Sequence, residues 1–376
     1  MIFIVFDVQE TTSCCGRNGL NRTACLNHIS GGAYPRAADV AHQGAIMSTH
    51  RTVAVLGPIP RDRITTHHGD ILDRYGCVLY AVAALSALMA TSDRICPVVH
   101  VRREDEEPIK NLLKGLPNVD LTGIRSATDS GDIVELDYVD QNVRIERQSG
   151  FMSPILPKDI RFVLDADAFV CVPITDYEVS NQTLAYIRQN SNGVILLDGH
   201  GPTRALSVGG ERVRRLWADR DTWLGNVDIL KMNLEEAGCS WFAAGSRSSE
   251  AVFGAPLPVA EMPRFAEHCL RRGVQAVCIT LDEKGCVIYQ LDRDGTLQET
   301  FVPPVPVGHV IDTTGCGDSF AAGMAFGYLE HHDFVSAARY GNALGAQRCS
   351  EPGLGYHDLA ETNRQILDTY GSLSLA

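Results

Sequence analysis

The sequence predicts an α/β protein in which helices cover both faces of a mostly parallel sheet that carries a small β lid. Strand-like and helix-like segments alternate from residue 52 onward, which is typical of parallel sheets built from crossover connections. Residues 131–148 interrupt this order, because their apolar positions recur with period two around the turn Asp140-Gln141-Asn142. That pattern indicates an antiparallel hairpin. We interpret the hairpin as a lid over the site, with a decorated sheet edge as the alternative.

The separate elements follow from local composition. Apolar and β-branched runs predict strands at 52–56, 97–101, 168–174, 194–198, 227–232, 276–281 and 286–291. Helical spacing of apolar residues predicts helices at 78–89, 181–189 and 263–271. Parallel sheets of this kind bind ligands at the carboxyl ends of their strands, so we expect the site there.

Composition excludes several classes of partner. The 376 residues carry a net charge of −13, and their Lys and Arg residues form no basic block, so nucleic acid is not an expected partner. The longest apolar run, 77–90, is too short to span a bilayer, and no membrane partner is expected. Twelve cysteines without metal-ligand spacing indicate a reducing, cytoplasmic setting.

The first 46 residues differ from the rest of the chain, because they show no hydrophobic periodicity and are rich in Gly, Asn, Ser and Arg. We therefore expect a disordered N-terminal extension at 1–46 and one domain at 47–376, with its lid hairpin at about 131–148. A transit peptide is the alternative for the extension, and Asp7 and Glu10 count against it.

The stretch "HVIDTTGCGDSFAAGMAFGYL" at 309–329 suggests chemistry. Helical spacing begins near Asp318, so we expect a helix to start there, after a turn in which Gly315 and Gly317 leave the backbone amides uncovered. Free amides and the helix dipole make such a start an anion site. A carboxylate would repel that anion, so we assign Asp318 to proton handling, with a helix-capping aspartate as the alternative.

The string "DTTGCGDSFAAG" at 312–323 resembles the C-terminal signature of the ribokinase-like carbohydrate kinases, the pfkB family, and weaker matches in the family's order extend over 52–353. The resemblance implies ATP-dependent phosphorylation of a hydroxyl group. Asp318 would then accept the hydroxyl proton. The amides of Gly315, Cys316 and Gly317 would stabilise charge on the transferring phosphoryl group.

The resemblance also implies two cation sites. Asn233 and Glu236 have the N-x-x-E spacing that in the family helps organise Mg²⁺, largely through waters. A helix-capping pair is the alternative, and both readings can hold together. Asp312 and Thr314 match positions that in relatives help hold a monovalent cation, here K⁺.

Nucleotide contacts are implied at Thr280, Gly285 and Asn342. The segment "ITLDEKGCVIY" (279–289) resembles the family's strand–turn–strand near the nucleotide, although Asp282 replaces its usual first glycine. Asn342 falls where the family often lines the adenine pocket. The alternatives are an ordinary hairpin for the segment and a solvated helix face for Asn342.

Substrate contacts are implied near the first strand. In "GPIPRDRI" (57–64), Asp62 matches an aspartate that binds substrate hydroxyls, with a surface-turn aspartate as the alternative. Gly76 fits the second glycine of a further family motif, but Tyr75 replaces the first glycine and Tyr80 replaces an asparagine that touches the sugar. Tyr80 would either stack on a substrate ring or fill the core as a buried tyrosine.

The predicted function is therefore phosphate transfer from Mg·ATP to a hydroxyl of a sugar or sugar-like molecule, and a homodimer through the lid is considered. The alternatives are a nucleoside kinase of the same fold, with Tyr80 stacking on a base, and a catalytically idle regulator that binds the ligand. Cys316 is a candidate reactive thiol, because a helix N-terminus favours the thiolate. An inert, buried cysteine is the alternative.

Overall fold

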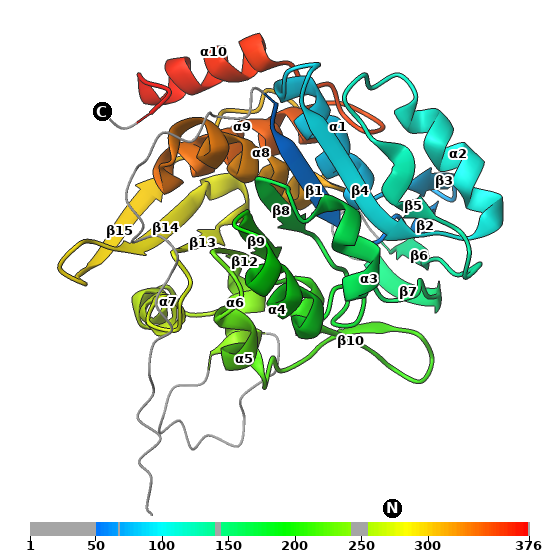
Figure 1. Ribbon diagram of the computed structural model, residues 1–376, viewed down its shortest axis with the longest axis horizontal. Helices are drawn as coiled ribbons and strands as arrows, with labels where there is room; N and C mark the ends of the chain where they lie inside the picture. The colour runs from blue at the N-terminus through cyan, green and yellow to red at the C-terminus, as the bar shows by residue number, and fades with distance from the viewer. Residues whose placement is uncertain (1–49, 67, 140–143, 242–254, 375–376) are drawn as a thin grey trace, which may run out of the picture. The chain divides into compact units, whose positions relative to one another are not determined.

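The structure is a computed structural model that describes residues 50–66, 68–139, 144–241 and 255–374 (Figure 1). The chain divides into two units, Met1–Met47 and Ser48–Ala376. The predicted extension at 1–46 and the turn at 140–142 lie outside the described residues. The disordered state of the extension therefore stays a prediction.

The predicted α/β fold is confirmed by a large sheet, in which nine strands of the described residues follow the order β15-β14-β13-β12-β9-β8-β1-β4-β5. The strands from β5 to β13 pair in parallel, and β14 and β15 complete the sheet as antiparallel strands. The strands of this sheet are β1 (Thr52–Leu56), β4 (Arg94–His100), β5 (Ile124–Arg125), β8 (Ala168–Cys171), β9 (Val194–Asp198), β12 (Ile229–Asn233), β13 (Ala276–Thr280), β14 (Cys286–Leu291) and β15 (Leu297–Val302).

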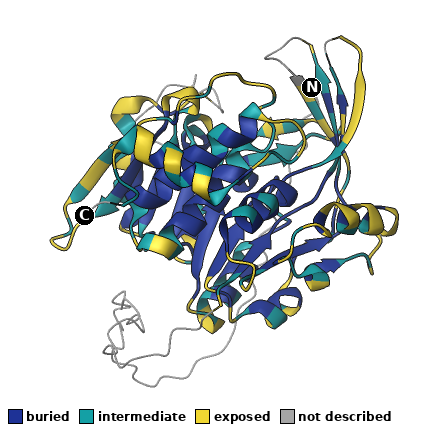
Figure 2. Ribbon diagram, turned by 90° about the horizontal axis from the view of Figure 1, so that it is seen from above, coloured by how far each residue is buried: buried dark blue, intermediate teal, exposed yellow. Residues whose placement is uncertain are grey.

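Helices cover both faces of this sheet, as Figure 1 shows, with α1, α8 and α9 on one face and α4 and α7 on the other. The helices are α1 (Val78–Leu88), α2 (Arg103–Leu113), α3 (Pro157–Ile160), α4 (Asn181–Asn190), α5 (Arg220–Leu224), α6 (Leu234–Ser240), α7 (Met262–Leu270), α8 (Cys316–His331), α9 (Phe334–Ser350) and α10 (Leu359–Tyr370). Central strands such as β8 and β9 are buried at every position, because both of their faces meet helices (Figure 2).

A second sheet, which we call the lid sheet, has four strands in the order β3-β2-β6-β7. Its strands are β2 (Arg61–Thr65), β3 (Ile71–Tyr75), β6 (Ile133–Tyr138) and β7 (Arg144–Gly150). The predicted hairpin is present as β6 and β7, which pair antiparallel. The pair β2 and β3 was not predicted, and Asp62 lies in strand β2 rather than in a loop. Short, polar strands carry a weak periodic signal. Here β2 is held by pairing with β6, and β3 by pairing with β2.

Two smaller features complete the frame of the site. The strands β10 (Arg204–Leu206) and β11 (Arg212–Arg214) form a two-stranded ribbon, and an isolated bridge joins it to β7. Helix α8 begins at Cys316, two residues earlier than predicted, because Gly315 takes a left-handed conformation (φ 80°) and lets the helix start at once. Within the described residues, no helix combines the length and apolar character needed to cross a membrane.

Candidate active site

A cavity of about 920 Å³ lies where the carboxyl ends of β9, β12 and β13 meet the start of α8 and the lid sheet. Most residues predicted for the site line this cavity: Asp62, Tyr80, Asn233, Glu236, Thr280, Gly285, Thr314, Gly315, Cys316, Gly317, Asp318 and Asn342. Two further predicted residues, Gly76 and Asp312, are not among the residues that line the cavity. Gly76 packs against Asp62, and the Asp312 carboxylate accepts a hydrogen bond from the Thr314 amide.

The glycine turn at the start of α8 is shaped for an anion. A side chain at Gly315 would place its Cβ 2.3 Å from the ring of Tyr80, so only glycine fits there. The first turn of α8 leaves the amides of Gly317 and Asp318 without acceptors inside the helix. A Cβ at Gly317 would lie 3.0 Å from Nζ of Lys231, which places an ammonium group beside these amides.

Asp318 has a carboxyl group that titrates near neutrality. Burial, and then the negative charge of Asp198, raise its pKa to about 7, while Lys231 acts in the opposite direction. The thiol of Cys77 donates a hydrogen bond to Oδ1 of Asp318 across 3.6 Å. This pKa suits a group that must accept and release a proton at physiological pH.

Lys231 and Asp198 form a buried ion pair that the sequence analysis missed. Their side chains are 8% and 6% exposed, and Nζ lies 2.7 Å from Oδ2. The charge of Asp198 keeps the pKa of the lysine above its usual value despite burial, so the ammonium stays charged. The available signal was Lys231 itself, a charged residue within the predicted strand 227–232.

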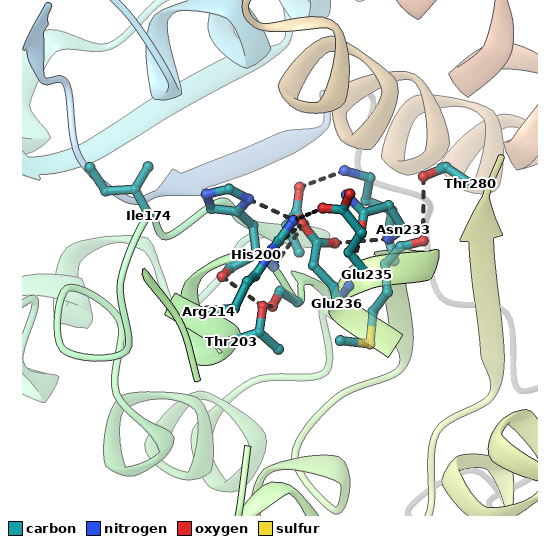
Figure 3. A network of polar contacts seen from close by, with 12 residues as sticks. Ile174, His200, Thr203, Arg214, Asn233, Glu235, Glu236 and Thr280 are labelled. Carbon is teal, nitrogen blue, oxygen red and sulfur yellow. Dashed lines mark hydrogen bonds and ion pairs between the residues drawn. The ribbon is translucent and has the colours of Figure 1, made fainter. Parts of the chain in front are cut away.

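Asn233 and Glu236 form a capping box at the start of α6, in which each side chain accepts a hydrogen bond from the other's amide (Figure 3). Burial alone would raise the pKa of Glu236. The hydrogen bond from His200 (3.0 Å) and the charge of Lys231 nevertheless hold it at about 2. The capping alternative is therefore present, and the carboxylate stays ionised.

Asn233 and Glu236 fit a magnesium ion that is held through its water shell, because their oxygen atoms already accept hydrogen bonds from each other's amides and from His200. Across the described ranges, no cluster of three or more His, Cys, Asp and Glu side chains could hold a metal alone. Mg²⁺ keeps several waters and uses few protein ligands, so an ionised carboxylate that lines the cavity is an appropriate partner for those waters.

The three predicted nucleotide residues lie on one side of the cavity. Gly285 has a positive φ of 91°, which glycine adopts without strain. A Cβ at this position would also lie 2.3 Å from the carbonyl oxygen of Val302, so a side chain does not fit. Asn342 is buried rather than solvated, and its amide donates to the carbonyl oxygen of Pro303 at 2.9 Å. Thr280 reaches the carbonyl oxygen of Met232 at 3.4 Å. The contacts of these residues with a nucleotide stay predictions.

The substrate end is defined by Asp62 and Tyr80. Asp62 is 6% exposed and lines the cavity, so it is not a surface-turn residue. Tyr80 is 1% exposed, and the guanidinium of Arg348 lies 4.7 Å from its ring centre. The ring thus packs between Arg348 and the turn at Gly315, which favours the core alternative over stacking on a substrate.

The candidate thiol of Cys316 lies in contact with a second thiol, that of Cys349. A hydrogen bond from Cys316 lowers the pKa of Cys349 to about 7. The same contact and burial raise the pKa of Cys316, which favours the inert alternative for this residue. Both residues line the cavity, and we expect the acidic thiol at Cys349, which is the more buried of the two.

The α/β fold thus places an open glycine turn next to a buried carboxyl group with a pKa of about 7. Residues 213–361 match the family model described as pfkB family carbohydrate kinase, in agreement with the resemblance predicted from the sequence. The solved ribokinase of Giardia lamblia has the same fold, with a TM-score of 0.66 over 85% of this chain and 99% of that one, at 17% identity. A structure described as Ribokinase II from E. coli, in complex with ATP and Mg²⁺, aligns with a TM-score of 0.62 over 85% of this chain and 99% of that one, at 16% identity.

The relatives by sequence match over shorter segments. The 2-dehydro-3-deoxygluconokinase of Bacillus subtilis is 32% identical over 139 residues, or 37% of this chain and 38% of the relative. A nucleoside kinase of Methanocaldococcus jannaschii is 36% identical over 70 residues, or 19% of this chain and 22% of the relative. The chain thus matches well under half of the length of these relatives.

Proposed function

We propose that this chain is a kinase that transfers the γ-phosphate of ATP to a hydroxyl group of a sugar or sugar-like molecule. The observation that carries this proposal is the arrangement of Asp318, with a pKa of about 7, directly beside an open glycine turn and the ammonium of Lys231. A base, free amides and a fixed cation are the parts that phosphoryl transfer requires.

The proposed reaction follows from these parts. Asp318 takes the proton of the substrate hydroxyl while that oxygen bonds to the γ-phosphorus and the bond to the β,γ-bridging oxygen breaks. The amides of Gly317 and Asp318, together with Lys231, stabilise the charge on the transferring group. This set differs from the predicted Gly315, Cys316 and Gly317, because the Cys316 amide already donates to the carbonyl oxygen of Thr313 at 3.3 Å. The resulting ADP carries the electrons of the broken bond, and the proton on Asp318 returns to solvent.

Mg²⁺, when bound with ATP, would neutralise charge on the phosphates, and Asn233 and Glu236 would hold its water shell. The relative structure that contains ATP and Mg²⁺ supports this donor. Thr280, Gly285 and Asn342 would contact the nucleotide from their side of the cavity.

A sugar-like substrate is favoured over a nucleoside. The nucleoside alternative depended on Tyr80 stacking on a base, and this ring is already covered by Arg348 and Gly315. Asp62 can accept hydrogen bonds from two neighbouring hydroxyls, which suits a polyol. The nucleoside kinase among the relatives keeps that class as the second candidate.

Two further parts of the proposal concern assembly and location. The tip of the lid sheet exposes apolar side chains, namely Ile71, Leu72, Val139 and Ile145, which supports a homodimer formed through the lid. The nine cysteines of the described residues are free thiols, which supports a reducing cytoplasmic setting.

The test is a screen of sugars, sugar acids, polyols and nucleosides for substrate-dependent release of ADP from Mg·ATP. A sugar or polyol that is turned over supports the proposal, and a nucleoside alone would reverse the order of the two candidates. Ligand binding without turnover in any sample would favour the idle regulator.

A further inference from the structure

Asp312 does not have the free oxygen atoms that a cation site requires. Its Oδ2 accepts from Nη1 of Arg74 at 2.6 Å and from Nη2 of Arg348 at 3.0 Å. Its Oδ1 accepts from the Thr314 amide at 2.9 Å. Two guanidinium groups therefore occupy the carboxylate that the resemblance assigned to K⁺.

The carbonyl oxygens around Asp312 are also engaged. Nη1 of Arg348 donates to the carbonyl oxygen of Glu351 at 2.7 Å. The carbonyl oxygen of Cys349 accepts the amides of Ile311 and Asp312, at 2.7 and 3.3 Å. K⁺ is held in proteins by oxygen atoms that replace its water shell, so it would have to compete here with existing hydrogen bonds.

Charge opposes a cation at the same place. Arg348 is fully buried, and the two guanidinium groups already supply the positive charge that neutralises the Asp312 carboxylate. This charge is felt inside the cavity, because Arg348 is among the groups that lower the pKa of Asp318. A further cation would be repelled, whereas the phosphoryl group is attracted.

The two arginines are fixed by separate elements. Arg348, on α9, stacks on the ring of Tyr80, and this ring packs against Gly315. Arg74, on β3, lies directly across from Asp62 of β2 in the lid sheet. Asp312 thus ties the phosphate turn to α9 on one side and to the lid sheet on the other.

We propose that this protein needs no monovalent cation, because the guanidinium groups of Arg74 and Arg348 hold Asp312 and supply the positive charge behind the phosphate turn. The residues do not fit K⁺, and the two arginines act as positioning residues for the turn. The part of this inference that concerns turnover rests on the proposed kinase function.

The first experiment uses the unaltered full chain and needs no substrate. Its melting temperature is measured in KCl, NaCl and tetramethylammonium chloride at equal ionic strength, with and without Mg·ADP. We expect the three salts to give the same value, within about 1 °C. A selective rise in KCl would show a bound cation and overturn the proposal, even if no substrate had been found.

The second experiment compares turnover in the same salts, with the substrate identified by the screen. The unaltered protein should differ by less than about twofold between salts. Arg74→Met should lower turnover by about tenfold, less than the loss of a direct oxyanion donor. Millimolar guanidinium, or K⁺ entering the vacated position, should restore turnover. Arg63→Met, an exposed position on the neighbouring strand β2, is the matched control.

Rescue of Arg74→Met but not of the control supports the positioning role, since a residue needed only for folding would not respond to a small cation. Activation of the unaltered protein by K⁺ of more than about threefold overturns the inference. An Arg74→Met variant with normal turnover in every salt overturns the role of Arg74. If that variant does not fold, the two measurements on the unaltered protein still decide the cation question.

Discussion

At the scale of single residues, the site depends on a few side chains whose properties are set by their neighbours. Asp318 is the clearest example. An aspartate in water has a pKa near 4, but burial and the charge of Asp198 bring this carboxyl group to about 7. Glu236 shows the opposite effect, because His200 and Lys231 lower the pKa of its carboxyl group despite burial.

Asp318→Asn should lower turnover by about 10²–10⁴, the range for loss of a general base, while ATP binding changes little.

In the unaltered protein, Asp318 acts as a base only when its carboxyl group is deprotonated. Turnover should therefore fall as pH drops below about 7. Steady-state kinetics across pH 5.5–9, with ATP affinity by calorimetry, would check both. Near-normal turnover of the variant, or a flat acid limb, would contradict the assigned role.

Lys231→Met should reduce both turnover and stability. Turnover should fall by about 10²–10³, as for loss of a donor to the transferring group. Stability should fall by about 3–5 kcal/mol, because Asp198 is left buried without its partner. The double variant Lys231→Met with Asp198→Asn should recover most of the stability without turnover. If the double variant were fully active, Lys231 would have only a structural role.

Alkylation should identify Cys349 as the reactive thiol of the cavity. Iodoacetamide at pH 7.5 should inactivate the protein, and Mg·ATP should slow the reaction by covering the cavity wall. Cys349→Ser should remove the sensitivity. Cys316→Ala should slow the reaction, because the hydrogen bond that stabilises the thiolate is lost. Mass spectrometry of the modified peptide checks the site, and label on another cysteine would contradict this assignment.

At the scale of elements, the base of the lid sheet contains a buried pair of carboxyl groups. Asp132 leads into β6 and accepts hydrogen bonds from Gln148 of β7 and the Met152 amide, at 2.7 and 3.2 Å. Glu178, fully buried, accepts from the amides of Ile174 and Thr175 at the cavity edge. Burial, followed by the charge of Asp132, raises the pKa of Glu178 to about 8.

The raised pKa makes the stability of this region depend on pH. The folded protein keeps a proton on Glu178 between about pH 4.5 and 8, where the unfolded chain has lost it, so stability falls as pH rises through this window. Glu178→Gln should remove this effect and melt several degrees above the unaltered protein at pH 8.5, but not at pH 5. Glu107→Gln, on an exposed face of α2, is the control. A constant difference at both pH values would contradict the assignment.

At the scale of the whole molecule, the sheet collects residues from distant parts of the chain into one cavity. The lid sheet closes one side of it, and the start of α8 closes another. Segments 1–46 and 47–376 differ in composition, and only the second has the periodic apolar pattern that builds a core.

Deleting residues 1–46 should therefore leave melting temperature and turnover unchanged within experimental error. Differential scanning calorimetry of both forms, with the substrate screen repeated on the shorter one, would check this. A loss of several degrees would mean that the extension contributes to the folded domain, and a change in KM alone would mean that it contributes to the site.

The sequence alone determined the α/β class, most strands of the large sheet, the hairpin β6–β7, the glycine turn before α8 and the N-x-x-E pair, because these features are local. β-branched runs, helical spacing and glycine turns act within about twenty residues. Only the tertiary structure decided that β2 and β3 join the lid sheet and that Lys231 faces Asp198. It also decided that Arg74 and Arg348 hold Asp312. Arg74 and Asp312 are 238 residues apart, and no periodic pattern reports a contact made only when the sheet brings its strand ends together.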